Sequence, residues 1–148
     1  MKYLAYGANM DAEIMAHRCP GAKMLGTGKL GGWRLMFKGE EPFAYATIEE
    51  WLGYSVPYVL WEISEEDERK LDRFEGYPKH YKKFTAAIDY DDETCLAMFY
   101  AKDEGERVGQ PMTHYVEVIS AAYDLFKFDR SILDEALRLS NDYYQRGF

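Results

Sequence analysis

The chain has 148 residues, of which 47% are hydrophobic and 16% aromatic, a composition typical of a folded globular protein and not of a disordered one. Its length is that of one ordinary domain, so we expect residues 1–148 to form a single domain. The net charge of −8 argues against nucleic acid as a partner, because phosphate binding depends on lysine and arginine.

The two cysteines, Cys19 and Cys95, are far apart and form no C-x-x-C pair. The sequence shows no secretion signal and no apolar run approaching the ~18 residues of a membrane span. We therefore expect a cytoplasmic protein with reduced cysteines and no membrane partner. His17, His80 and His114 lack metal-ligand spacing and no nucleotide motif is present, so we expect neither a metal nor a cofactor.

Residues 3–10, Tyr-Leu-Ala-Tyr-Gly-Ala-Asn-Met, begin as a short apolar strand and break at Gly7 into a loop of small residues. The loop leads directly into a helical segment from Asp11 to Arg18. Such a connection points several backbone N–H groups in one direction and can hold a carboxylate or a developing oxyanion. The alternative is that Gly7 only makes a turn and Asn9 only caps the helix.

Apolar or alternating runs bounded by turn residues predict further strands. These strands cover residues 23–30, 33–37, 45–49, 56–63, 81–90 and 94–101. Gly31-Gly32 and Gly53 mark connections between them, and residues 91–93 turn the last two into a hairpin. About six strands with few interspersed helices indicate an α+β fold, in which the strands curl into a small, mixed, barrel-like sheet with peripheral helices.

A helix is predicted from Ser64, which forms a capping-box pattern with Asp67. Leu71 and Phe74 then follow at helical spacing, and Gly76 stands where a left-handed residue usually ends a helix.

Past Pro111 the pattern is again helical, because apolar residues recur on one face: Tyr115, Val118, Ile119, Ala122, Leu125 and Phe126. Asp129 or Ser131 begins a final helix whose apolar positions lie between residues 132 and 137.

Glu75 is the residue in which we expect unusual chemistry. It closes a helix beside Gly76 and is flanked by Phe74, Tyr77 and Tyr81. The helix macrodipole disfavours negative charge at this end, and aromatic neighbours exclude water, so both effects raise the pKa of the carboxyl toward the range useful for proton transfer. The alternative is a solvated surface glutamate, one of many in an acidic chain.

Two segments resemble the signature segments of the γ-glutamylcyclotransferase-like family. They are residues 6–10 (Tyr-Gly-Ala-Asn-Met) and residues 71–81 (Leu-Asp-x-x-Glu-Gly-Tyr-Pro-x-x-Tyr), in the family's order and separation. Residues 46–48, Tyr100 and Tyr115 also resemble family positions, so the similarity covers nearly the whole chain. Ala8 stands where the family commonly has serine, which removes one possible hydroxyl contact to a substrate.

The resemblance implies a cofactor-free reaction on a small γ-glutamyl substrate. The α-amine of the γ-glutamyl group attacks its own γ-carbonyl, and 5-oxoproline is released with an amine or an amino acid. Glu75 matches the family's proton-shuttling glutamate, whereas for Tyr115 we favour a role in core packing. The resemblance and the loop geometry together give the expected substrate-binding residues: Tyr6, Gly7, Ala8, Asn9, Met10, Tyr81 and Tyr100.

Two other functions stay open at this point. One is a non-catalytic binding protein with the same fold and anion-binding loop, although Glu75 beside Gly7 and Asn9 favours an enzyme. The other is an unrelated hydrolase with paired carboxylates, which requires a second acid opposite Glu75. The leaving group of the substrate and the oligomeric state are not predicted.

Overall fold

The computed structural model describes residues 1–146, with side chains through residue 143. Its strands are β1 (Lys2–Ala5), β2 (Lys23–Lys38), β3 (Tyr45–Glu62), β4 (Lys82–Tyr90) and β5 (Glu93–Ala101). Its helices are α1 (Ala12–Arg18), α2 (Glu65–Glu75), α3 (Thr113–Leu125) and α4 (Arg130–Arg146), and a short 3-10 turn, η1, spans Ala8–Met10. The expected α+β architecture is confirmed.

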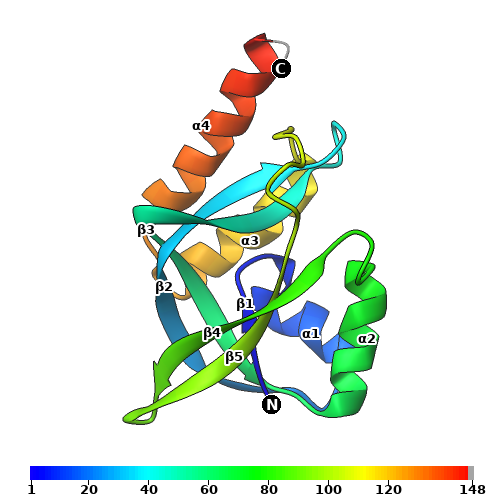
Figure 1. Cartoon of the computed structure of the whole chain (residues 1–148), viewed down its shortest axis with the longest axis vertical. Coiled ribbons are helices and arrows are strands. Elements are labelled where there is room, and N and C mark those ends of the chain that lie inside the picture. The colour runs from blue at the N-terminus through cyan, green and yellow to red at the C-terminus, as the bar shows by residue number, and fades with distance from the viewer. Residues whose placement is uncertain (147–148) are drawn as a thin grey trace.

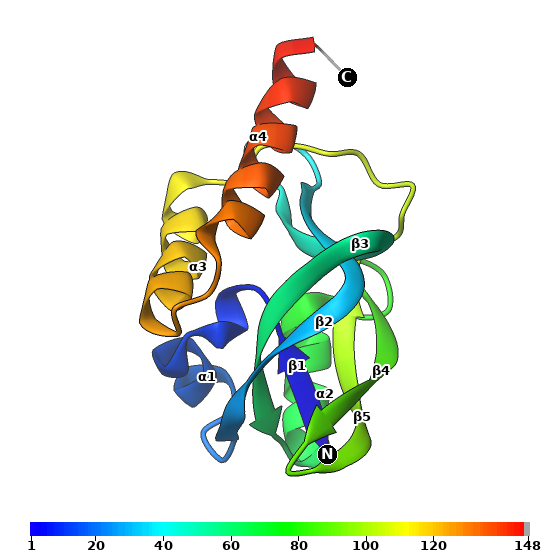
Figure 2. The same cartoon turned by 90° about the vertical axis from the view of Figure 1, so that its left-hand side faces the viewer.

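The five strands form one mixed sheet in the order β2-β3-β1-β5-β4. The short strand β1 lies at its centre, antiparallel to β3 and parallel to β5. Figures 1 and 2 show the strands crossing steeply, with α1 and α3 on the same side of the sheet and α4 extending away from it. Because β1 is central, the loop that follows it emerges from the middle of the fold.

The expected number of about six strands is corrected to five. Between residues 23 and 63 the sequence predicted four short strands, and the structure has two long ones, β2 and β3, paired with a register shift between Gly31 and Trp33. Gly32 and Gly53 have φ values of 83° and 88°. Glycine adopts this left-handed region without a steric penalty, so these residues bend long strands and do not end them.

The predicted capping of α2 is confirmed. Ser64 Oγ accepts a hydrogen bond from the Asp67 N–H at 3.0 Å, and the Asp67 carboxylate accepts one from the Ser64 N–H at 3.1 Å. The helix ends at Gly76, whose φ is 67°. Leu71 is fully buried, but Phe74 is 57% exposed, so the apolar face of this helix is narrower than expected.

The C-terminal helices follow the predicted pattern with one exception. Ile119 and Ala122 are buried on α3, but Leu125 is 73% exposed, because the helix ends there and the chain turns toward α4. Of the two expected caps for α4, the structure has Asp129, whose carboxylate accepts a hydrogen bond from the Ser131 N–H at 3.0 Å.

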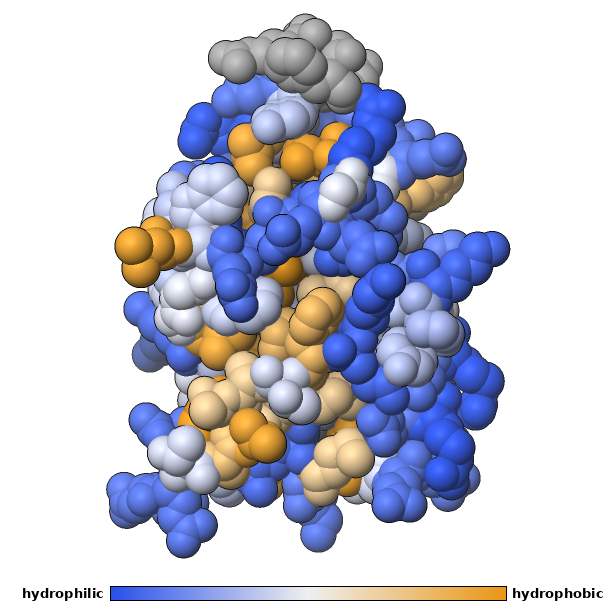
Figure 3. Space-filling view, in the orientation of Figure 1, coloured by the Kyte–Doolittle hydropathy of each residue, from blue (hydrophilic) through white to orange (hydrophobic). Residues whose placement is uncertain are grey.

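The molecular face in Figure 3 is mostly hydrophilic, with apolar side chains gathered in its lower part, where the β4–β5 hairpin lies. The exposed apolar residues of this hairpin include Phe84 and Leu96. Phe84 stacks on the buried Phe99 with ring centroids 5.6 Å apart. The exposed ring is therefore the outer layer of the same packing that forms the core.

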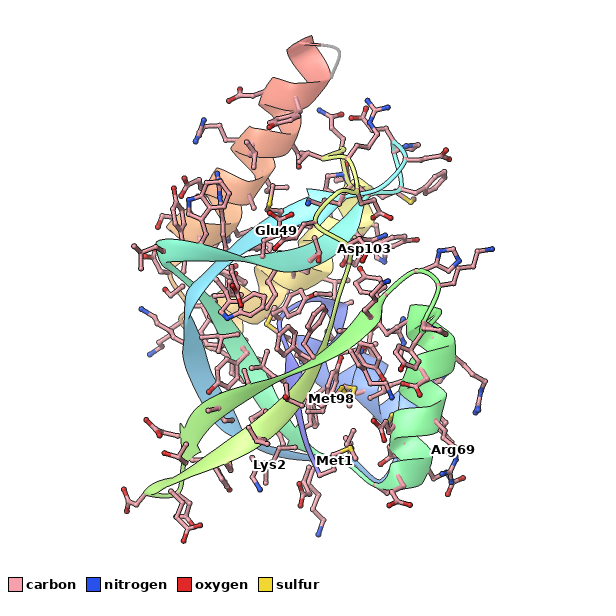
Figure 4. All side chains as sticks on the ribbon, in the orientation of Figure 1. Met1, Lys2, Glu49, Arg69, Met98 and Asp103 are labelled. Atoms are coloured by element: carbon pink, nitrogen blue, oxygen red, sulfur yellow. The ribbon has the colours of Figure 1, made fainter. Side chains whose placement is uncertain are left out.

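A buried lysine fixes the chain segment that follows β5. Lys38 is 2% exposed, and its Nζ donates to the Glu49 carboxylate and, at 2.8 Å, to the Glu104 carbonyl. Figure 4 shows Glu49 near the segment that carries Asp103. The position of Lys102, at the start of this segment, is thus tied to β2 and β3.

Candidate active site

A cavity of about 710 Å³ opens where the loop after β1, the end of α2, strand β5 and helix α3 meet. Its lining brings together residues that are up to 115 positions apart in the chain, from Tyr3 to Val118. Seven of the eight expected catalytic and substrate-binding residues line it: Tyr6, Gly7, Ala8, Asn9, Glu75, Tyr81 and Tyr100. Met10 does not, because its side chain is 1% exposed and packs in the core.

The loop after β1 forms the 3-10 turn η1. The Met10 N–H donates to the Gly7 carbonyl and the Asp11 N–H to the Ala8 carbonyl, each at 3.0 Å. The N–H groups of Ala8 and Asn9 precede these donors, at the helical end where backbone N–H groups lack intrahelical acceptors. Asp11, and not Asn9, caps α1, and it accepts from the N–H groups of residues 13 and 14. Asn9 is therefore free for another role.

Asn9 is 3% exposed and connects the loop to Glu75. Its Nδ2 donates to the Tyr3 hydroxyl at 2.9 Å and approaches Glu75 Oε1 at 3.5 Å. Its Oδ1 accepts from Arg18 Nη1 at 2.8 Å, and its backbone carbonyl accepts from Trp61 Nε1 at 3.0 Å. Sequence analysis did not predict these four contacts, because the positions of the partners relative to Asn9 depend on the folded chain.

The pKa of Glu75 is raised, as its position predicted, and the loss of water around the carboxyl is the larger of the two expected causes. Burial raises the pKa of its carboxyl to about 7, and the positive charges of Arg18 and Lys102 only partly oppose this effect. Of the three aromatic neighbours expected to exclude water, Tyr81 is buried and lines the cavity with Glu75, whereas Phe74 and Tyr77 are exposed. A carboxyl with this pKa can both accept and donate a proton near neutral pH.

Three of the tyrosines that line the cavity donate their hydroxyl protons to groups of the protein. Tyr6 donates to the Tyr100 carbonyl at 2.5 Å, and Tyr81 donates to the Ala46 carbonyl at 2.8 Å. Tyr100 donates to Asp72 Oδ1 at 2.6 Å, so its hydroxyl is directed to α2 and away from a ligand. Burial raises the pKa of each of these three phenols, which stay neutral.

Tyr115 combines core packing with a place in the cavity wall. Its ring packs edge-on against Phe37 and Tyr45, and its hydroxyl accepts a hydrogen bond from the Ala46 N–H at 2.9 Å. Because this contact uses only an acceptor site, the hydroxyl proton can still be donated to a ligand. An added Cβ at Gly7 would lie 3.5 Å from the Tyr115 hydroxyl oxygen.

The cavity carries positive charge, which sequence analysis did not predict. Arg18, Arg73 and Lys102 line it, and Glu75 is the one carboxylate among its described lining residues. Lys102 is 9% exposed and lies 2.7 Å from Glu106 Oε2. In the sequence these cations are far apart, so no local pattern marks them as a group.

The described part of the chain contains no cluster of three or more histidine, cysteine, aspartate or glutamate side chains that could hold a metal ion. Within the same residues, no helix is long and apolar enough to cross a membrane.

The raised pKa of Glu75 predicts a pH-dependent stability difference. The usual glutamate value is 4.5 and the folded value about 7, so Glu75 favours folding below pH 4.5 and this contribution is lost as the pH rises through 7. At pH 8 we expect Glu75→Gln to be more stable than the wild type by on the order of 3 kcal/mol, at roughly 1.4 kcal/mol per pKa unit. Denaturant titrations across this pH range measure the difference.

The matched control is Glu66→Gln, on an exposed position of the same helix. It should show no such pH dependence. Parallel stability curves for the wild type and Glu75→Gln would contradict the raised pKa.

Residues 3–118 match the family described as gamma-glutamyl cyclotransferase, AIG2-like. No match is found among curated proteins. A solved structure described as "Gamma-glutamyl cyclotransferase" has a TM-score of 0.80 at 19% identity, over 92% of this chain and 85% of that one. The structure of the uncharacterized protein loc79017 from Homo sapiens has a TM-score of 0.79 at 19% identity, over 91% of this chain and 85% of that one.

YkqA from Bacillus subtilis has a TM-score of 0.78 at 21% identity, over 95% of this chain and 54% of that longer one. At such identities these structures show a shared fold. The family match spans most of the chain, and the protein therefore belongs to the gamma-glutamyl cyclotransferase, AIG2-like family.

Proposed function

We propose that this protein catalyses the cofactor-free cyclisation of a γ-glutamyl amide. The α-amine nitrogen of the substrate attacks its own γ-carbonyl carbon, the bond from that carbon to the leaving nitrogen breaks, and 5-oxoproline is released with an amine or amino acid. The observation that carries the proposal is the position of the Glu75 carboxyl in the cavity beside the loop of η1, 3.5 Å from Asn9 Nδ2, where burial raises its pKa to about 7. Membership of the family supports the same reaction.

Because attack is intramolecular, the protein's main task is to hold the substrate in a reactive conformer. The N–H groups of Ala8 and Asn9 and the proton of the Tyr115 hydroxyl are donors for the glutamyl carboxylate or for the oxyanion that develops on the γ-carbonyl. Arg18 and Lys102 add positive charge to the same wall. Since the loop offers backbone donors, alanine at position 8 keeps this capacity without the serine hydroxyl.

Glu75 has the proton-transfer role. The substrate enters as an ammonium, whose nitrogen keeps one hydrogen in the lactam and therefore loses two protons overall. The leaving nitrogen gains two protons and departs as an ammonium. With a pKa of about 7, the Glu75 carboxylate takes a proton from the first nitrogen and, as the acid, returns it to the second.

The structure gives less support to other functions of this site. A hydrolase with paired carboxylates requires a second acid, and Glu75 is the one carboxylate among the described residues that line the cavity. A nucleophilic Cys19 is disfavoured too, because this residue is 1% exposed, lies outside the described lining and has a thiol pKa raised by burial. A non-catalytic binding protein has no need for a carboxyl with a perturbed pKa.

A panel of γ-glutamyl compounds tests the proposal. We expect the purified protein, without added metal or cofactor, to convert at least one γ-glutamyl amino acid or γ-glutamylamine to 5-oxoproline, detected by mass spectrometry. Binding of these compounds without any 5-oxoproline would favour the non-catalytic alternative.

Glu75→Gln should lower turnover by roughly 10²–10⁴-fold while substrate binding is retained, because glutamine keeps the size of the side chain but cannot carry the proton. In the wild type, kcat/KM should fall on the acid side with an apparent pKa near 7, since the carboxylate is the form that accepts the first proton. Steady-state kinetics from pH 5 to pH 9, roughly the window around that pKa, measure both effects.

The control Glu66→Gln should retain full activity. Unchanged turnover in Glu75→Gln would assign the base to another group and end this mechanism.

Gly7→Val should fold normally but lose substrate binding. An added Cβ would lie 3.5 Å from the Tyr115 hydroxyl and 3.6 Å from Ala46 Cβ, which is ordinary contact, so the fold accommodates it. The φ of Gly7 is −114°, so the expectation depends on space and not on a positive φ. The two valine methyl groups would extend into the cavity where we place the substrate. Calorimetry in a Glu75→Gln background measures the affinity without turnover.

Gly7→Ala, which adds only the Cβ, should retain more affinity than Gly7→Val. Wild-type affinity in the valine variant would show that the substrate lies elsewhere.

A further inference from the structure

Both oxygens of the Asp72 carboxylate on α2 are held by the β4–β5 hairpin. Oδ1 accepts from the Tyr100 hydroxyl at 2.6 Å, and Oδ2 accepts from Lys83 Nζ at 3.0 Å. Lys83 also donates to Glu68 Oε2, one turn earlier on the helix, at 3.0 Å. Lys83 and Tyr100 face each other across the two strands. One carboxylate therefore fastens the helix to both strands of the hairpin, which Figure 1 shows beside α2.

Apolar packing alone holds α2 weakly. Leu71 and Asp67 are its buried residues, and Asp67 is used in the capping box at the other end of the helix. With one buried apolar side chain, the rotation of α2 about its axis depends strongly on the polar contacts of the helix. Glu75 lies three residues after Asp72, on the same side of the helix, so a rotation would carry its carboxyl across the cavity.

We infer that Asp72 is a positioning residue for Glu75: held by Tyr100 and Lys83, it fixes the rotation of the last turn of α2 and so the place of the carboxyl in the cavity. This inference rests on the proposed function. Neither Asp72 nor Lys83 is among the residues that line the cavity, so neither acts on the substrate by contact.

The two donors keep their protons over the pH range in which Glu75 titrates. Burial and the contact with Asp72 raise the pKa of the Tyr100 phenol. Partial burial lowers the pKa of Lys83, but its hydrogen bonds to Asp72 and Glu68 outweigh this effect, and the net pKa is raised. The charges that act on Glu75 come from Arg18 and Lys102. Loss of the contacts to Asp72 should therefore change geometry and leave the pKa of Glu75 near its wild-type value.

Kinetics of Lys83 variants test the inference. Lys83→Met should lower kcat by about tenfold with KM within about twofold of wild type, because a misplaced catalytic group mainly affects the chemical step. The acid-side pKa of kcat/KM should stay near 7. Lys83→Arg keeps the charge and the donors, and should restore most of the activity.

The matched control is Lys82→Met, the neighbouring position on β4, whose exposed side chain lies 3.5 Å from Asp103. It should behave as wild type. Unchanged kcat in Lys83→Met would overturn the inference, and so would a loss that disappears when each variant is assayed well below its own Tm, since that loss reflects unfolding.

Amide hydrogen exchange gives a second readout that does not depend on turnover. In Lys83→Met we expect faster exchange at residues 72–77, with no change at residues 64–68, where the capping box is intact. If the wild type releases no 5-oxoproline, the proposed function fails, while exchange still reports on the attachment of α2. If the wild type is active and exchange at residues 72–77 is unchanged, the positioning role fails alone.

Discussion

The desolvation of the Glu75 carboxyl is the constraint on which the proposed chemistry depends. Desolvation penalises the charged form, and the positive charges of Arg18 and Lys102 are too weakly coupled to restore an ordinary pKa. A close ion pair with either cation would hold the carboxyl ionised and leave it unable to return a proton. Instead, its one hydrogen bond given by the structure is the long contact of 3.5 Å from Asn9. The pKa of Glu75 thus stays near 7 because no close charged partner stabilises its ionised form.

The sheet brings this carboxyl to its loop. Because β1 is the central strand, parallel to β5 and antiparallel to β3, the turn that follows it opens at the interior of the fold and not at an edge. The left-handed Gly76 ends α2 directly after Glu75, so the carboxyl lies on the last helical turn. Asn9, held by Arg18 and Trp61, then joins the two segments. The turn η1 supplies the backbone N–H donors, and α2 supplies the Glu75 carboxyl. The proposed reaction needs both in one cavity.

The structural features that the sequence predicted correctly depend mainly on residues close together in the chain. A capping box needs only Ser64 and Asp67 three residues apart, and a helix end needs only Gly76, so short-range physics decides them. The strand number failed because Gly32 is a turn signal in sequence, whereas pairing between β2 and β3 continues past it. Met10 shows the same limit within the site: it belongs to the turn η1, which lines the cavity through Ala8 and Asn9, yet its own side chain lies in the core. The cations of the cavity come from separate elements, and no local pattern could group them.

The division of polar groups within the cavity fits a reaction in which the substrate supplies its own nucleophile. Three hydroxyl groups, those of Tyr6, Tyr81 and Tyr100, donate to backbone carbonyls or to Asp72 on α2. These hydroxyl protons are therefore not offered to a substrate, and the rings serve as apolar walls of the cavity. Among the groups that can meet a ligand are the Tyr115 hydroxyl, backbone N–H groups, cations and one carboxyl. Fixed donors of this kind need little reorganisation when charge develops on a carbonyl oxygen. In a protein of net charge −8, the cations of this cavity wall would attract an anionic group of the proposed substrate to the site.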